Sequence, residues 1–209
     1  MSDRWTQLRE EFDAWADSYD RDRQASQGLL EHHAQSLRAA ADLLVVTAGQ
    51  ELLDIGVGTG AFGALYAERG ARVTGVDISP RMLHLAARAH PEWRLLEGHF
   101  LALPLADQSC DAAISAFAFH HLEDAERAPA LREICRVLRG DAFLLVDIMF
   151  PDEAAKDAGR RRLADHWEEE NYALFPDLAR TAAEVGLSAS FTRLSDLHGA
   201  ALLRRHPRA

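Results

Sequence analysis

The sequence predicts an α/β fold: a doubly wound, Rossmann-like and mostly parallel sheet of seven strands that ends in an antiparallel β-hairpin. Three observations support this prediction. After Gly49, short apolar runs alternate with amphipathic helical patterns, as right-handed strand–helix–strand crossovers require. The glycine-rich stretch DIGVGTGA, residues 54–61, follows the first run. The last two runs, at 188–194 and 198–205, are separated by only three residues, which is too short for a crossover helix, so they should pair antiparallel.

The region 1–46 predicts two amphipathic helices, because apolar residues recur every three to four positions. The first helix carries Trp5, Leu8, Phe12, Trp15, Ala16 and Tyr19 on one face, and the second carries Leu30, His33, Leu37, Ala40, Ala41 and Leu44. We expect this region to form an N-terminal helical cap or lid on a single globular domain that spans residues 47–209.

Strands and helices then follow in alternation. Buried strands are predicted at 51–56, 71–77, 93–98, 111–117 and 142–150, and helices at 62–70, 79–89, 124–140 and 177–185. Gly70 and Gly140 are expected to end the first and third of these helices, since glycine is common just after a helix. Ser79 is expected to cap the second through its side-chain oxygen.

The composition indicates one globular unit with a small-molecule partner. The chain has 209 residues, 48% of them hydrophobic, enough for a domain with a buried core. Its charged start lacks the apolar segment of a secretory signal, and no apolar run reaches the length of a membrane-spanning helix, so we expect no membrane association.

Cys110 and Cys135 form no CxxC motif and are expected in the core of a cytoplasmic protein. The net charge of −10 disfavours duplex nucleic acid, and the basic patches at 160–162 and 202–209 are interpreted as solvated surface.

The glycine-rich stretch lies where open α/β sheets bind ligands, at the carboxyl end of a strand. Gly56, Gly58 and Ala61 fit the G-x-G-x-x-A pattern of dinucleotide sites, and Asp77 closes the second strand at a suitable distance for a ribose hydroxyl. These residues taken by themselves favour NAD. Asp54 shifts the balance, because a carboxylate just ahead of the glycines would oppose a pyrophosphate at short range. S-adenosylmethionine has no phosphate and carries a sulfonium and an ammonium. It therefore fits better, although Asp54 bonded only to the loop amides stays an alternative.

Several stretches resemble, in order and spacing, the successive motifs of class I S-adenosylmethionine-dependent methyltransferases. They are LLDIGVGTGAFG, VTGVDISPRML, EGHFLALPLADQSCDAAISAFAFHHLED and REICRVLRGDAFLLVDIMF. The shorter stretches FDAWADSYD, AFHHL and DIMF are similar to a narrower group, the small bacterial methyltransferases of the YrrT type. The resemblance runs from about residue 15 to the C-terminal hairpin, and its fold agrees with the one predicted independently from the pattern.

This resemblance implies S-adenosyl-L-methionine as the cofactor and assigns residues to it. The implied contacts are Asp54, Gly56 and Gly58 for the methionyl end, Asp77 for the ribose hydroxyls, Ile78 and Met82 for the adenine, and Ala116 at the end of the fourth strand. Tyr19 is either a lid residue whose hydroxyl approaches the cofactor or a residue that only packs its helix against the domain.

Residue 99 departs from the family pattern. After the third strand the family usually has Gly-Asp, whose acid accepts a hydrogen bond from the adenine amino group, whereas this chain has Gly98-His99. A neutral imidazole can accept that bond through its unprotonated nitrogen. The alternative is that the backbone around Phe100 supplies the contact and His99 points outward.

Methyl transfer from a sulfonium is an in-line displacement that needs alignment, exclusion of water and, for some acceptors, a base; no metal is inherently required. The strand end at 115–118 reads Ser-Ala-Phe-Ala and differs from the Asp/Asn-Pro-Pro-aromatic stretch of enzymes that methylate DNA amino groups. We expect an acceptor pocket built from Phe119, His120, His121 and Asp147, under the segment 151–176. That segment is either a substrate lid or an ordinary solvated helix.

The adjacent His120 and His121 are compatible with a metal site, a base or packing. Neighbouring residues point to different sides of a strand or helix, and no further ligand cluster accompanies the pair, so no metal is expected. We expect His120 to face the pocket as a base or a substrate-orienting group. His121 is expected to be structural, hydrogen-bonded in the loop, and Asp147 completes the candidate catalytic set.

The preferred function is therefore a methyltransferase for a small-molecule acceptor. Two alternatives remain open, an NAD-dependent oxidoreductase and a non-catalytic S-adenosylmethionine-binding protein. The sequence predicts neither the acceptor, nor the methylated atom, nor the oligomeric state.

Overall fold

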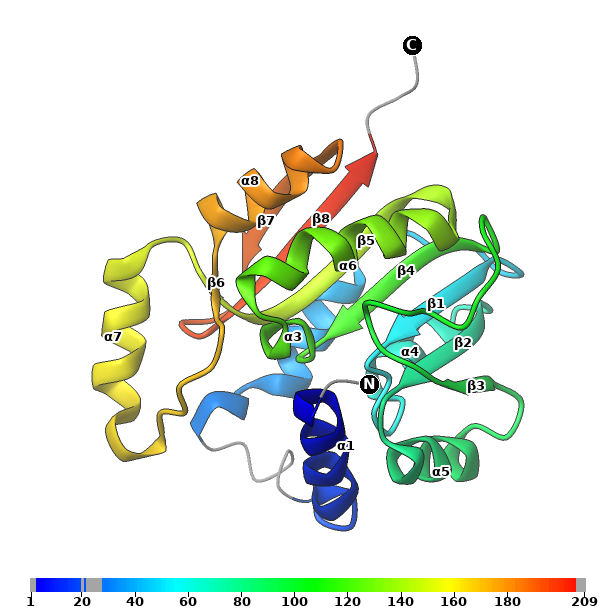
Figure 1. Ribbon diagram of the computed structural model, residues 1–209, viewed down its shortest axis with the longest axis horizontal. Helices are drawn as coiled ribbons and strands as arrows, with labels where there is room; N and C mark the ends of the chain where they lie inside the picture. Colours follow the sequence, from blue (N-terminus) through cyan, green and yellow to red (C-terminus); the bar gives the residue numbers. More distant parts are fainter. Residues whose placement is uncertain (1–2, 20, 22–27, 206–209) are drawn as a thin grey trace.

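An eight-stranded sheet forms the centre of the computed structural model, which describes residues 3–19, 21 and 28–205 (Figure 1). Its main strands are β1 (Glu51–Ile55), β2 (Arg72–Asp77), β3 (Arg94–Glu97), β4 (Cys110–Ala116), β5 (Leu138–Phe150), β7 (Leu187–Arg193) and β8 (His198–Arg205). They lie in the order β3-β2-β1-β4-β5-β8-β7, with β1 to β5 parallel and β8 antiparallel to both β5 and β7. The predicted doubly wound sheet with a terminal hairpin is thus confirmed, and a two-residue strand, β6 (Ala173–Leu174), is added beside β5.

Helices cover both faces of this sheet. They are α1 (Asp3–Trp15), α3 (His33–Ala41), α4 (Ala61–Ala67), α5 (Pro80–Ala89), α6 (Asp124–Val137), α7 (Glu153–Leu163) and α8 (Phe175–Glu184), with 3-10 turns η1 (Gly28–Leu30), η2 (Phe119–His121) and η3 (Ala164–His166). The helices α3 and α4 pack together on one face and α6 and α8 on the other, whereas α1 contacts α5 at the end of the sheet (Figure 1). Within the described ranges, no helix is long and apolar enough to cross a membrane.

Burial on both faces explains why the central strands read as continuous apolar runs. Successive side chains of a strand point to opposite faces, so in β5 Leu144 joins the core under α3 and α4, and Leu145 joins the core under α6 and α8. Leu37 and Ala40 of α3 belong to the first core. Of the two N-terminal helices, α3 is therefore part of the helical layer, and only α1 lies over the end of the sheet.

The expected helix ends are partly confirmed. Ser79 caps α5, since its side-chain oxygen accepts the Met82 amide at 3.0 Å, and Gly70 takes a positive φ of 89° after α4. The prediction for Gly140 was wrong, because α6 ends at Val137 and Gly140 lies inside β5. A Cβ at Gly140 would meet the Asp111 carbonyl oxygen at 1.8 Å, so glycine is required there by the close approach of β4.

Candidate active site

The loop between β1 and α4 turns tightly against the loop that follows β4. Gly56 and Gly58 have positive φ angles of 69° and 53°, which favour glycine. A Cβ on Gly56 would lie 2.5 Å from the Cβ of Ala118. The two glycines therefore allow backbone to approach closely at the carboxyl ends of β1 and β4.

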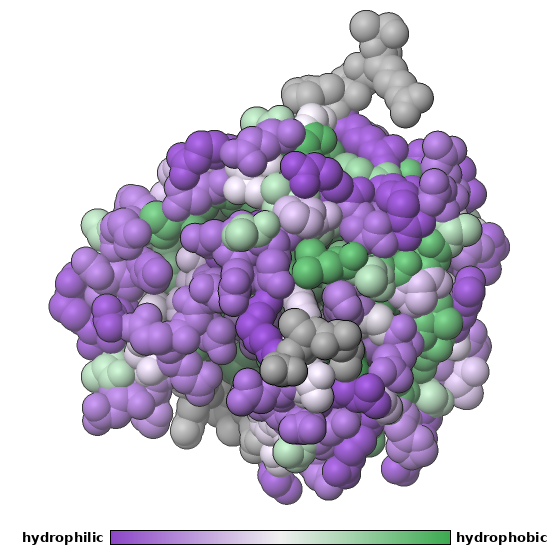
Figure 2. All heavy atoms as spheres, in the orientation of Figure 1, coloured by the Kyte–Doolittle hydropathy of each residue, from purple (hydrophilic) through white to green (hydrophobic). Residues whose placement is uncertain are grey.

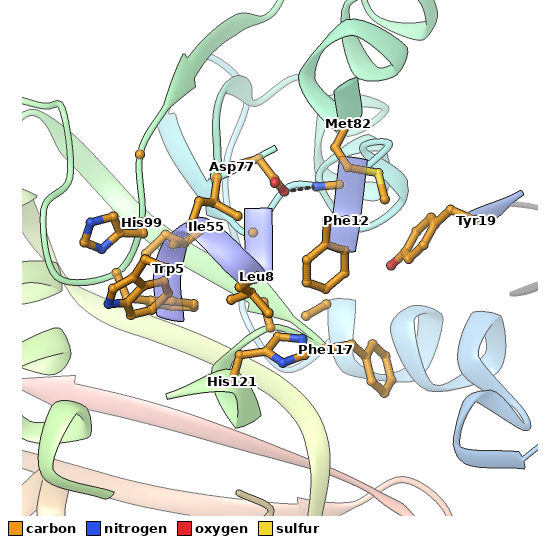
Figure 3. Close-up of a pocket in the computed structure, with 17 residues that line it drawn as sticks. Trp5, Leu8, Phe12, Tyr19, Ile55, Asp77, Met82, His99, Phe117 and His121 are labelled. Atoms are coloured by element: carbon orange, nitrogen blue, oxygen red, sulfur yellow. Dashed lines mark hydrogen bonds between the residues drawn. The ribbon is translucent and has the colours of Figure 1, made fainter. Parts of the chain in front are cut away.

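Asp77, at the end of β2, holds this loop in place. Its Oδ2 accepts the Gly58 amide at 2.8 Å, and its Oδ1 accepts the Ser79 amide at 2.9 Å. Figure 3 shows the carboxylate directed at the glycine loop. Burial raises the pKa of Asp77 to about 6, against the opposing effect of these backbone amides.

Asp54 lies near the carboxyl end of β1, just ahead of the glycines, and its side chain bonds to the backbone of α4. The carboxylate is 1% exposed, and its Oδ2 accepts the Gly63 amide in α4 at 2.9 Å. Burial raises the pKa of Asp54 to about 7. The side chain points away from the strand end, toward the first turn of α4. This arrangement is similar to the alternative in which Asp54 bonds only to backbone amides, although the amide belongs to α4 and not to the loop.

The glycine loop opens into a pocket that we call the glycine-loop pocket. All residues implied to bind the cofactor except Asp54 line it, namely Tyr19, Gly56, Gly58, Asp77, Ile78, Met82, His99, Phe100 and Ala116. The remaining wall includes Trp5, Leu8 and Phe12 of α1 together with Phe117 (Figure 3). These four residues were not predicted to line a site, although the apolar face of α1 was visible in the sequence.

α1 covers this pocket through specific contacts. The Trp5 indole stacks on the His99 imidazole with ring centroids 4.6 Å apart (Figure 3). Arg9 pairs with Glu97 at 2.8 Å, and the Asp13 carboxylate accepts the Ser79 hydroxyl at 2.5 Å. With α1 in place, the enclosed space is only about 60 Å³.

His99 is held by its own loop. Its Nδ1 accepts the Leu101 amide at 3.3 Å, and burial lowers its pKa. A neutral ring with Nδ1 as acceptor carries its proton on Nε2. His99 therefore presents an N–H donor to its surroundings, while its face rests on Trp5.

His120 and Asp147 form a buried pair between η2 and β5. His120 Nδ1 lies 2.5 Å from Asp147 Oδ1, and Asp147 Oδ2 accepts the amides of Phe119 and His120 at 3.0 Å each. Since a carboxylate only accepts, these bonds put a proton on His120 Nδ1 and leave Nε2 as the basic nitrogen. Burial opposes protonation of His120, but the charge and hydrogen bond of Asp147 outweigh it, so the pKa of His120 is raised.

His121 differs from the expectation of a strut hydrogen-bonded in its loop. Its ring lines the glycine-loop pocket and packs edge-on against Phe12 at 5.2 Å, and the nearest acid to its Nδ1 is Glu170 at 3.9 Å. Burial lowers its pKa well below the usual value, helped by the charges of His120 and Arg4. His121, not His120, therefore faces the glycine loop.

A second cavity of about 320 Å³ adjoins the first. The two share Phe12, Tyr19, Phe117 and His121, and the second adds His120 and the segment 165–172. Of the predicted lid, α7 is largely exposed, while the stretch that follows it forms this wall. The side chain of Phe119 is fully buried in the core instead.

Phe117 stands at the junction of the two cavities in a strained conformation. Its φ is 52°, a region that side chains other than glycine rarely adopt. Its ring stacks on His33 at 4.4 Å and meets the edge of His198 at 4.8 Å, which holds it in place. Strain of this kind is concentrated at functional sites.

Comparison with known proteins identifies the family. The model of the methyltransferase domain matches residues 53–146. An uncharacterised methyltransferase from Geobacillus thermodenitrificans is 35% identical over 196 residues, 87% of this chain and 89% of the relative. The uncharacterised methyltransferase YrrT from Bacillus subtilis is 29% identical, with 88% and 92% covered. The chain belongs to the class I S-adenosylmethionine-dependent methyltransferases.

Solved methyltransferase structures have a similar fold. The magnesium protoporphyrin IX methyltransferase of Synechocystis, solved with bound S-adenosylhomocysteine, superposes with a TM-score of 0.74 at 17% identity, over 96% of this chain and 99% of that one. S-adenosylmethionine is the cofactor, and the protein is a methyltransferase. The two other functions that the sequence left open are therefore set aside.

The residues present fit this cofactor. A Cβ on Gly58 would project toward Tyr19, 3.9 Å away, so its absence leaves room in the pocket wall. The buried Asp77 carboxylate and the apolar side chains of Ile78 and Met82 offer an acceptor beside an apolar slot.

Proposed function

We propose that the protein methylates a small-molecule acceptor held in the second cavity, with His120 as the general base. The observation that carries this proposal is the bond between His120 Nδ1 and Asp147 Oδ1, because it leaves the basic Nε2 for the cavity that His120 lines. A raised pKa in a histidine oriented by a carboxylate suits proton abstraction near neutral pH.

The cofactor-binding roles follow from the glycine-loop pocket. The cofactor supplies a methyl group already activated on a sulfonium. Gly56 and Gly58 allow close backbone approach at the methionyl end, Asp77 accepts hydrogen bonds from the ribose hydroxyls, and Ile78 and Met82 line the adenine. The backbone near Phe100 and the wall residue Ala116 complete this set.

His99 takes a different role from the acid that the family usually has. Because its Nδ1 is occupied by the Leu101 amide, its Nε2–H is a donor, and the ring nitrogens of adenine are acceptors. We assign His99 to that contact, with Trp5 stacked behind it. Tyr19, which lies at the junction of both cavities, closes the site over the reacting groups.

The test is a labelled-methyl assay on the full chain. The small-molecule fraction of a bacterial extract is incubated with S-adenosylmethionine labelled on its methyl group, and products are identified by mass. The proposal expects label in at least one compound of low mass. Binding of S-adenosylhomocysteine without label in any such compound would contradict it. The cytoplasmic location stays a prediction.

A further inference from the structure

Among the described residues, the wall of the second cavity carries four carboxylates and no lysine or arginine. What this excess of acidic groups implies for the acceptor rests on the function proposed above. The four carboxylates are Glu11 of α1 and Asp165, Glu168 and Glu170 of the stretch after α7. Within the described ranges, no cationic group lies within 4 Å of Glu11, Asp165 or Glu168. Figure 2 shows that the face over α7 and this stretch is mainly hydrophilic.

Glu170 lies deepest of the four. Its side chain is 35% exposed, and its nearest basic group is His121 Nδ1 at 3.9 Å. Burial lowers the pKa of His121 well below neutrality, so that ring does not balance the charge. Burial, together with the charges of Glu11 and Glu168, raises the pKa of Glu170 against an opposing effect of His120. A positive group of a ligand would relieve this repulsion.

Aromatic rings face the same space. Phe12, Trp15, Phe117 and Tyr172 line the cavity, and the Tyr172 hydroxyl donates to the Glu168 carbonyl at 2.8 Å, which ties this ring to the acidic stretch. Aromatic faces attract cations and also hold apolar bodies. Carboxylates combined with aromatic walls are the chemistry that recognises organic ammonium groups.

His120 supplies an independent indication that a ligand belongs here. Its side chain is nine-tenths buried, lines the cavity, and has no protein partner for Nε2 among the described residues. Among the described residues this nitrogen is not one of the fully buried atoms without a partner, so it is accessible from the cavity and can bond to water or to a substrate group there.

We propose that the methyl acceptor is a small organic cation, an amine with an aromatic or aliphatic body. Its ammonium lies among Glu168, Glu170 and the aromatic rings, and its nucleophilic group reaches His120. His120 Nε2 takes the proton of that group, and the freed lone pair bonds to the methyl carbon. The carbon–sulfur bond breaks at the same time, and its electron pair stays on sulfur. An anionic acceptor would be repelled by the same carboxylates.

Three probes that share a phenol ring and differ in charge test this proposal directly: tyramine, 2-(4-hydroxyphenyl)ethanol and 4-hydroxyphenylacetate. Their binding to the full chain loaded with S-adenosylhomocysteine is measured by calorimetry. We expect tyramine to bind at least tenfold more tightly than the neutral alcohol, and the carboxylate to bind most weakly. Equal affinities, a reversed order or no tyramine binding at millimolar concentration would overturn the proposal.

A variant without the two carboxylates tests whether Glu168 and Glu170 cause the preference for the cationic probe. The double variant Glu168→Gln/Glu170→Gln should lose at least fivefold in tyramine affinity, with alcohol and S-adenosylhomocysteine binding unchanged. Glu169→Gln is the matched control, since Glu169 pairs with Arg160 and is not part of the cavity wall. Wild-type tyramine affinity in the double variant would also overturn the proposal. Failure of the wild type to bind S-adenosylhomocysteine would instead count against the proposed function.

Discussion

Asp54 shows how a residue near the site imposes a cost on stability. Its carboxylate is fully buried and accepts one amide hydrogen bond, from Gly63, so its ionised form is poorly solvated. The folded-state pKa of about 7 lies above the ordinary value of 3.8. The stabilising contribution of Asp54 is therefore complete below about pH 4 and is lost as the pH rises through 7.

Asp54→Asn is expected to stabilise the protein in a pH-dependent way. Asparagine keeps an acceptor for the Gly63 amide and carries no charge, so the gain at pH 8 should be a few kcal/mol, about 4 at most. The gain should shrink toward pH 4. Urea unfolding at pH 8 and pH 5 measures the free energy of unfolding of both proteins. Equal values at pH 8 would show that the buried charge of Asp54 does not destabilise the fold.

Gly56 and Gly186 separate two reasons for requiring glycine. Both have positive φ, but a Cβ on Gly56 would meet Ala118 at 2.5 Å, whereas nothing lies within 4 Å of one on Gly186. Gly56→Ala should cost about 1–3 kcal/mol more than Gly186→Ala, because it adds a clash to the backbone strain. It should also weaken S-adenosylhomocysteine binding. Thermal unfolding and calorimetry provide both readouts, and equal effects of the two substitutions would contradict the close approach.

At the scale of elements, we expect α1 to move when the cofactor binds. The pocket beneath it has a volume of about 60 Å³, less than a nucleoside cofactor fills, so we predict that α1 lifts for entry. Trp5 is buried and stacks on His99, while other contacts of α1, such as the hydrogen bond from Arg9 to Glu97, are exposed. A helix with few buried contacts opens at lower free energy than the central strands.

Trp5→Ala should loosen this cover. Loss of one buried aromatic contact is expected to raise the dissociation rate of S-adenosylhomocysteine by roughly tenfold and to speed hydrogen exchange across α1. Exchange in β1 and β4 should not change. Val45→Ala is the control, since Val45 is an apolar side chain that is 81% exposed. A wild-type dissociation rate in Trp5→Ala would show that α1 does not gate the pocket.

At the scale of the whole molecule, His198 connects distant parts of the chain. It is fully buried on β8, its Nε2 donates to the Leu29 carbonyl at 2.7 Å, and its Nδ1 accepts the Ser36 hydroxyl at 2.8 Å. Burial lowers its pKa below the usual 6.5. Its stabilising effect is therefore complete above pH 6.5 and is lost as the pH falls.

His198→Gln should thus reduce the acid sensitivity of the fold. The loss of Tm between pH 7.5 and pH 5 is expected to be smaller in the variant than in the wild type, although the variant is less stable at pH 7.5. Because Asp54 acts in the opposite direction, the informative quantity is the difference between the two proteins. The exposed His84→Gln should behave like the wild type; an unchanged pH dependence in His198→Gln would contradict the assignment.

The sequence predicted the features that depend on residues close together in the chain. The strands, the terminal hairpin, the glycine loop and the Ser79 cap follow from residue types whose requirements are local, and the structure contains them. Gly140 was misread because a close approach between β4 and β5 has the same sequence signature as a helix end. The positive φ of Phe117 has no such signature, and the rings that pack against Phe117, His33 and His198, come from distant parts of the chain.

The orientation of the paired histidines depends on long-range bonds. Asp147 lies 27 residues from His120, and its carboxylate fixes both the ring and the backbone of η2. The role of α1 likewise depends on where Trp5 and Phe12 dock, which helical periodicity does not encode. The residues that the sequence assigned to the cofactor, except Asp54, therefore share one pocket wall, whereas the orientation of the paired histidines could not be predicted.

The central claim, that His120 is the base for methyl transfer, is tested most directly by His120→Ala. Single-turnover transfer of labelled methyl to the acceptor should fall by about 10²–10⁴-fold in the variant, because proton abstraction is lost. Affinity for S-adenosylhomocysteine, measured on the same protein, should stay at the wild-type value. Unchanged methyl transfer in a variant that still binds S-adenosylhomocysteine would contradict the assignment of His120.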